Sequence, residues 1–180
     1  MRRIVQKPLL NFVDTDIADL AALLRLPVDD EQVVRFLGPF LSKIRRSAYY
    51  GFIVLKGDGL DVVFNEAPWV IPEAEIVDPK RLYLCAFHLH RDGHSGYPQY
   101  RGKLPNGVAF GDSEADLIDK MGEPFATGGG GMSSVPPKLP IPRWLKYGMG
   151  GGAILHFQLD GHDRIDMVTL MTPDVRPKPA

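Results

Sequence analysis

The sequence predicts an α+β fold built from two related units, each a short helix followed by an antiparallel β-meander. Residues 29–40 and 111–125 share one pattern, in which polar capping residues open an amphipathic stretch and a glycine ends it. Strand-like runs separated by tight turns follow both segments. We therefore expect one unit over residues 1–92 and a second over residues 93–180, packed as one compact body.

Three segments have the apolar spacing of amphipathic helices. Residues 14–24 follow an Asp/Thr capping signal, and Pro27 ends this stretch. Residues 30–37 and 113–121 each combine an apolar side with charged residues opposite. We expect a helix in each of the three segments.

Strands are expected where β-branched and aromatic residues gather between turn signals. Residues 49–55 and 60–64 flank Gly57-Asp58-Gly59, a hairpin signal because glycine supplies the positive φ of a tight turn. The other expected strands are residues 81–90, 144–147, 153–159 and 164–171. Within residues 81–90, the more apolar of the two alternating sets is predicted to face the core, namely Tyr83, Cys85, Phe87 and Leu89.

The glycine- and proline-rich segment before the last strands is predicted to lack regular structure. Residues 127–134 form an expected flexible loop, and residues 136–142 are expected to be extended. A phosphate-binding loop needs Gly-Lys-Ser/Thr at a helix start, and neither glycine tract has that lysine.

The net charge, the lengths of the apolar runs and the single cysteine of the chain exclude several classes of function. The net charge of −1 and two isolated basic pairs give no phosphate-tracking stripe, so we expect no nucleic-acid partner. No apolar run approaches the ~20 residues of a membrane span, and no export signal is visible, so the expected location is the cytoplasm without membrane contact. Cys85 lies in an apolar run and is expected to be a buried, unreactive thiol.

The densest polar cluster offers one chemical alternative. His88 and His90 share a strand face, and His94 could return across the Gly93 turn as a third ligand, leaving one coordination position for water. These residues would make the protein a zinc-dependent hydrolase. Histidines at alternate strand positions are also common on wet faces, and no nucleophile with a neighbouring base is evident. The favoured prediction is therefore a protein that is not an enzyme and needs no metal or cofactor.

Aromatic residues in and beside loops favour a binding role, because Tyr and Trp bury a large area with little loss of rotamer entropy. For Trp144 the alternative of sealing the core is equally good. Tyr97→Ala is expected to weaken partner binding with little change in melting temperature. The predicted partner contacts are His94, Tyr97, Tyr100, Glu114, Asp116, Asp119 and Trp144.

Residues 94–113, Gly122-Glu123-Pro124, and the later segment with Trp144, Tyr147 and residues 160–170 resemble a known class of small bacterial proteins. These are the immunity proteins encoded beside secreted toxins of the polymorphic-toxin and type VI secretion kinds. The resemblance covers about half of the chain, residues 91–171. It implies stoichiometric neutralisation of a cognate toxin that acts in the cytoplasm, by occluding or locking its active site, and it implies no catalytic residue.

A second resemblance is architectural. A glycine, a capped helix ending in Met-Gly-x-Pro and a three-stranded meander are similar to the unit of BamE-type lipoproteins. β-Lactamase inhibitory protein joins two such units and uses its concave sheet to block an enzyme. The present chain has neither the lipoprotein cysteine nor an export signal. We expect it to be a monomer or homodimer when free, and a non-enzymatic assembly module remains a further alternative.

Overall fold

The computed structural model describes residues 15–173 and 175, which form a mixed α+β fold with a large antiparallel sheet and few helices. The α+β class is therefore confirmed. Eight strands within these residues form the sheet, in the spatial order β1 (Arg45–Arg46), β2 (Tyr50–Leu55), β3 (Leu60–Glu66), β4 (Leu82–His90), β10 (Ile165–Met171), β9 (Ile154–Leu159), β8 (Trp144–Gly148) and β5 (Ala126–Gly128).

The α-helices of the described residues begin and end within a few positions of the predicted segments. They are α1 (Ile17–Leu23), α2 (Glu31–Leu37) and α3 (Glu114–Met121). Asp16 and Asp30 cap the first two by accepting backbone N–H groups two residues on. Ser113 caps α3 in a reciprocal capping box with Asp116. Gly122, with φ of 80°, ends α3 in a conformation that favours glycine.

Both parts of the chain meet at the centre of the sheet, where β4 pairs antiparallel with β10. Next to β4, the sheet continues outward with β3 and β2, which precede it in the chain. Next to β10, it continues outward with β9 and β8. One hydrophobic cluster runs from Ile17 through Phe87 to Leu170. Residues before and after position 92 therefore share a sheet and a core.

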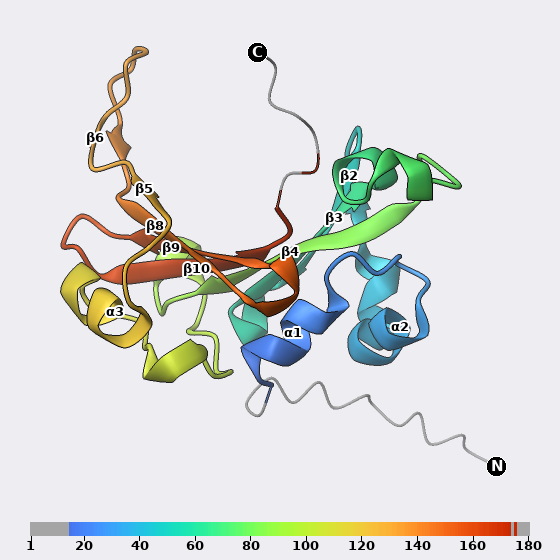
Figure 1. Ribbon diagram of the computed structural model, residues 1–180, viewed down its shortest axis with the longest axis horizontal. Coiled ribbons are helices and arrows are strands. Elements are labelled where there is room, and N and C mark those ends of the chain that lie inside the picture. Colours follow the sequence, from blue (N-terminus) through green and yellow to red (C-terminus); the bar gives the residue numbers. More distant parts are fainter. Residues whose placement is uncertain (1–14, 174, 176–180) are drawn as a thin grey trace.

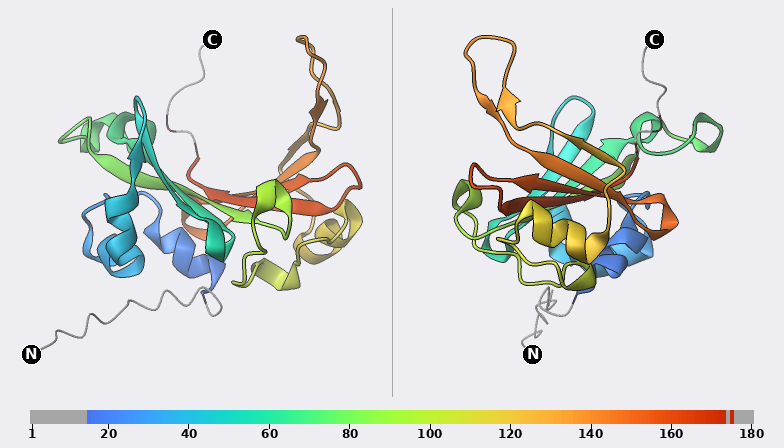
Figure 2. Two further views of the ribbon diagram at one scale, coloured as in Figure 1. Left: turned by 180° about the vertical axis from the view of Figure 1, so that it is seen from behind. Right: turned by 60° about the vertical axis from the view of Figure 1, so that its left-hand side comes forward.

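The α-helices lie together on one face of the sheet, and the core fills the space between them and the strands (Figures 1 and 2). Phe64, Phe87 and Phe157 are fully buried there. Phe36 packs edge-on against Phe87, with ring centroids 6.2 Å apart, so the end of α2 is fixed to the middle of β4.

A smaller hydrophobic cluster occupies the opposite face at the β3–β4 end of the sheet. The connection between β3 and β4 contains the short 3₁₀ helices η4 (Ala67–Trp69) and η5 (Glu73–Glu75). Its residues Ala67, Val70 and Ile71 pack on Tyr83 and its neighbours in β4. This connection covers one end of the face that carries no α-helix.

A β-bulge corrects the predicted alternation in β4. Val63 pairs with Ala86 and Phe64 with Leu84, so Cys85 is an extra residue without an opposite partner. The bulge reverses which residues face the helices: Leu82 and Leu84 join Phe87 and Leu89 in the main core, whereas Tyr83 and Cys85 belong to the smaller cluster. The strict period of two assumed for this strand was therefore wrong.

Cys85 is a buried thiol, as expected. Its side chain is 8% exposed, and burial raises its pKa to about 12. The thiolate that a nucleophile needs is therefore scarce at neutral pH.

Residues 129–142 form a hairpin arm rather than an unstructured loop. Its two short strands, β6 (Gly131–Met132) and β7 (Pro140–Ile141), pair antiparallel with each other and belong to a separate sheet. The arm rises from the side of the sheet opposite the α-helices (Figures 1 and 2). In the described part of the chain, no helix has the length and apolar character needed to cross a membrane.

Phe87→Ala tests the placement of the core. We expect it to lower the free energy of unfolding by about 3 to 5 kcal/mol, because it opens a cavity under α2. Phe125→Ala is the matched control, since the Phe125 side chain is 61% exposed and its loss should change stability little. Urea denaturation measures both; equal effects of the two substitutions would contradict this placement.

Candidate functional site

Among the described residues, no α-helix covers one of the two faces of the β8–β9–β10 end of the sheet (Figures 1 and 2). Leu145, Tyr147, Leu155 and Phe157 point into the main core, so the residues that alternate with them point the other way. Among the described residues, these alternating side chains belong to neither hydrophobic cluster, and none is fully buried. We call this surface the open face; it consists of Trp144, Lys146, Ile154, His156, Gln158 and Met167.

A row of polar groups crosses the sheet from the open face into β3. Strand register places Lys146 opposite His156, His156 opposite Thr169, Thr169 opposite His88, and His88 opposite Asp61. These residues come from five adjacent strands, β8, β9, β10, β4 and β3. The row therefore depends on the long-range pairing of β4 with β10.

Two histidines of this row are held neutral. Burial lowers the pKa of His88 below its usual value of 6.5, and its Nδ1 lies 2.9 Å from Thr169 Oγ1. Burial also lowers the pKa of His156, with smaller contributions from Lys146 and His88. Trp144 packs edge-on against His156, with ring centroids 5.5 Å apart. At neutral pH the open face thus presents uncharged imidazole and indole rings beside one lysine.

A hollow of about 390 Å³ lies where the polar row meets the smaller hydrophobic cluster. Its walls include Trp69, Cys85 and Met171 together with His88 and Thr169. Asn65 also lines it, and its side-chain oxygen is buried without a hydrogen-bond partner in the structure. The surface beside the polar row is therefore recessed rather than flat.

A second polar cluster fixes the connection that follows β4. Asp61 of β3 accepts a hydrogen bond from the Tyr97 hydroxyl at 2.8 Å, and His90 Nε2 lies 3.0 Å from the same carboxylate. The Tyr97 ring stacks on the His90 ring, with centroids 3.9 Å apart. The His94 ring also stacks on the His90 ring, with centroids 5.2 Å apart. His94 pairs through Nδ1 with Asp166, the extra residue of a bulge in β10. We call these five residues the clamp, because they hold residues 91–97 against β3 and β10.

The clamp contains two predicted contacts, His94 and Tyr97, and two histidines of the metal alternative, His90 and His94. His94 and Tyr97 are half-buried, and their polar atoms bind within the protein. His88, His90 and His94 each have a separate partner, and the rings of His90 and His94 are stacked rather than aimed at one point. Within the described residues, no group of three or more His, Cys, Asp or Glu side chains is arranged to hold a metal ion.

Tyr100 is a core residue rather than an exposed contact. Its side chain is 2% exposed within the main hydrophobic cluster, and burial raises its pKa. Residues 98–100 lie so close to Gly59 that a Cβ at this glycine would approach Pro98 O to 2.4 Å. The prediction that Tyr100 is available to a partner is therefore wrong, because this polar linker packs back onto the sheet.

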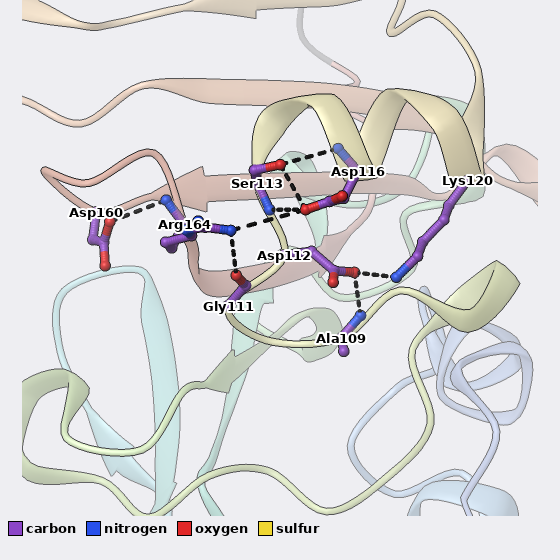
Figure 3. Close-up of polar contacts among 8 residues, drawn as sticks. All are labelled: Ala109, Gly111, Asp112, Ser113, Asp116, Lys120, Asp160 and Arg164. Carbon is purple, nitrogen blue, oxygen red and sulfur yellow. Dashed lines mark hydrogen bonds and ion pairs between the residues drawn. The ribbon is translucent and has the colours of Figure 1, made fainter.

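Two acidic residues predicted as contacts also support local structure. Asp116 accepts hydrogen bonds from the backbone N–H and hydroxyl of Ser113, at 2.9 and 2.6 Å, in the first turn of α3 (Figure 3). Asp112 binds Lys120 at 2.6 Å, and Arg164 approaches Asp116 at 3.9 Å (Figure 3). Glu114 binds Arg143 through two hydrogen bonds, of 2.8 and 3.1 Å, which lower the pKa of Glu114.

The remaining two predicted contacts lie on the surface in different places. Asp119 is exposed on α3, on the helix side of the sheet. Trp144 is half-exposed on the open face, where the Lys146 Nζ atom lies 5.2 Å from its ring centroid. The predicted contacts therefore do not form one surface. Sequence reasoning missed Asp61, His156, Met167 and Asp166, because only strand register brings them beside Trp144 and the histidines.

Comparisons with known proteins add little. No family model matches the chain, and no curated protein matches it. Among solved structures, a DUF4309 family protein (YjgB) from Bacillus subtilis has a TM-score of 0.35 and 11% sequence identity, over 72% of this chain and 68% of that chain. A likeness at this TM-score supports no argument about this chain.

The clamp changes the expectation for Tyr97. Tyr97→Phe keeps the ring on His90 but loses the hydrogen bond to Asp61, so we expect a loss of about 1 to 3 kcal/mol of unfolding free energy. Tyr97→Ala loses the stacked ring as well and should destabilise the protein further. Thermal unfolding followed by circular dichroism tests this order; a wild-type melting temperature for Tyr97→Ala would contradict the clamp.

The neutral histidines predict a pH dependence of stability. Because the pKa of His88 is lowered in the folded state, the unfolded chain takes up a proton near pH 6.5 that the folded protein takes up only at lower pH. The contribution of His88 to the free energy of unfolding is therefore fully present above about pH 6.5 and decreases as the pH falls below this value. We expect His88→Gln to reduce the pH dependence of urea unfolding between about pH 7.5 and 5. An unchanged slope would show that His88 is not the group responsible.

Proposed function

We propose that this protein is an immunity protein that binds and neutralises a toxin acting in the bacterial cytoplasm, and that it does so through the open face. The observation that carries the proposal is the one-sided placement of the helices. It leaves Trp144, His156 and Met167 partly exposed on the adjacent strands β8, β9 and β10. Aromatic residues and Met are enriched in protein interfaces relative to the rest of a protein surface.

The arrangement of the strands supports the tandem plan within this proposal. The meander β2-β3-β4 follows α2, the strands β8, β9 and β10 follow α3, and the two groups adjoin through β4 and β10. We propose that they are two copies of one helix-plus-meander unit. Joining them edge to edge doubles the width of the sheet, which suits a surface that must cover an enzyme.

Neutralisation of this kind needs no chemical step in the immunity protein. Within the described residues, His90 and His94 have the carboxylate partners expected of acid–base groups, but both are engaged in the clamp. A rigid face loses little conformational entropy on binding, which favours a tight complex. We propose that the open face and its surroundings occlude the toxin's active site or lock it in an inactive conformation.

The test uses the protein encoded by the adjacent gene as the toxin. Gln158→Arg places a large charge in the middle of the open face, whereas Gln32→Arg makes the same change on exposed α2, on the helix side. We expect wild type and Gln32→Arg to rescue growth on co-expression and to co-purify with the toxin. Gln158→Arg should raise the dissociation constant at least ~10-fold, which corresponds to about 1.4 kcal/mol.

Unfolding curves of both variants must match wild type for this comparison to hold. If neither rescue nor a complex is seen with the wild-type protein, the immunity proposal is wrong. If Gln32→Arg weakens binding and Gln158→Arg does not, the partner binds the helix side instead.

A further inference from the structure

The arm, residues 129–142, rises on the side of the sheet opposite the α-helices, which is also the side of the open face (Figures 1 and 2). It carries a single charged residue, Lys138. Four of its apolar side chains are among the most exposed large hydrophobic groups of the described residues: Met132 at 56%, Val135 at 69%, Leu139 at 59% and Ile141 at 42%. Apolar groups gathered on a projection gain nothing in the free protein, and they gain free energy only when a partner removes them from water.

The arm is also held in one shape before any partner binds. Ser133 closes its tip, because its hydroxyl oxygen accepts from Leu139 N at 3.0 Å and lies 2.9 Å from Val135 O. Ser133 N donates to Leu139 O at 2.8 Å, next to the β6–β7 pairing. Pro136, Pro137, Pro140 and Pro142 fix four φ angles in the same segment. A segment ordered in advance loses less entropy on binding than a flexible loop.

The base of the arm is anchored to the body, because the flanking residues Gly128 and Trp144 pair with each other in the main sheet. Gly129 has φ of 72°, and a Cβ there would approach Pro142 O to 1.9 Å, so the two strands are in close contact. Arg143, the residue after the arm, forms its paired hydrogen bonds with Glu114 at the start of α3. The hydrogen bonds between Glu114 and Arg143 therefore help to fix the orientation of the arm relative to the body.

We infer that the arm is an insertion element that enters a cleft of the toxin lined by apolar side chains, with Lys138 facing a carboxylate group of that cleft. This inference rests on the proposed function and adds the part of the surface that penetrates the partner. The alternative occupant is a second copy of this chain. The open face of a second copy fits less well, because it offers Lys146, His156 and Gln158 to the aliphatic arm.

An environment-sensitive fluorophore on the arm tests the inference directly. Val135→Cys supplies an exposed thiol near the tip, and the natural thiol of Cys85 is buried with a pKa raised to about 12, so acrylodan should label the introduced position. Val77→Cys is the matched control, because Val77 is 92% exposed and lies outside the arm, in the connection between β3 and β4. Adding the protein encoded by the adjacent gene should shift the emission of the arm label to shorter wavelength and leave the control label unchanged.

Charge substitutions give an independent measurement of affinity. Leu139→Asp should weaken the complex at least ~10-fold, whereas Val77→Asp, the same kind of change outside the arm, should leave the dissociation constant within about twofold. Lys138→Glu should weaken the complex more at low salt than at high salt, because the pair of charges is screened by ions.

The outcomes separate this inference from the proposed function. If Gln158→Arg weakens the complex but Leu139→Asp does not, and the arm label does not shift, the open face binds the toxin and the insertion is wrong. If the label shifts with rising concentration of the protein alone, the arm inserts into a second copy and the inference is overturned. If no complex forms with wild type, both the function and the inference fail.

Discussion

The pairing of β4 with β10 is the interaction on which the rest of this structure depends. It joins residues 82–90 to residues 165–171, and it brings the strands of both parts of the chain into one sheet. The main core is continuous across this pair, from Ile17 to Leu170. The polar row, the clamp and the hollow all combine residues from the two parts. Without this pairing, His88 would have no Thr169 beside it and His94 no Asp166.

The two faces of the sheet have different physical roles. The helix side is dry and supplies stability through buried aromatic and aliphatic side chains. On the opposite side, the β3–β4 connection covers one end of the sheet, and among the described residues the open face and the arm are in contact with solvent. The polar side chains that sequence reasoning treated as partner contacts mostly serve this construction: Asp116 caps α3, Glu114 holds the base of the arm through Arg143, and Tyr97 closes the clamp.

Local signals in the sequence were sufficient for the helices and hairpins. The capping residues and terminal glycines predicted the ends of α2 and α3 to within one residue. Gly57-Asp58-Gly59 predicted the turn between β2 and β3. The site could be predicted only in fragments. The bulge at Cys85 changes which side chains face the core, and no sequence pattern marks it. Tyr100 lies in a polar, proline-containing linker, yet it is buried because that linker packs onto Gly59. Arg143 and Glu114 are 29 positions apart, and only the folded chain brings them together.

Hydroxyl-radical footprinting of the complex with the adjacent gene's product would test the central claim most directly. Trp144 and Met167 have oxidisable side chains on the open face, and Phe125 is an exposed ring outside it. The account predicts that complex formation protects Trp144 and Met167 while Phe125 is oxidised at the same rate as in the free protein. Protection of Phe125 or of the exposed α2 surface, with Trp144 and Met167 unchanged, would contradict the assignment of the open face as the binding surface.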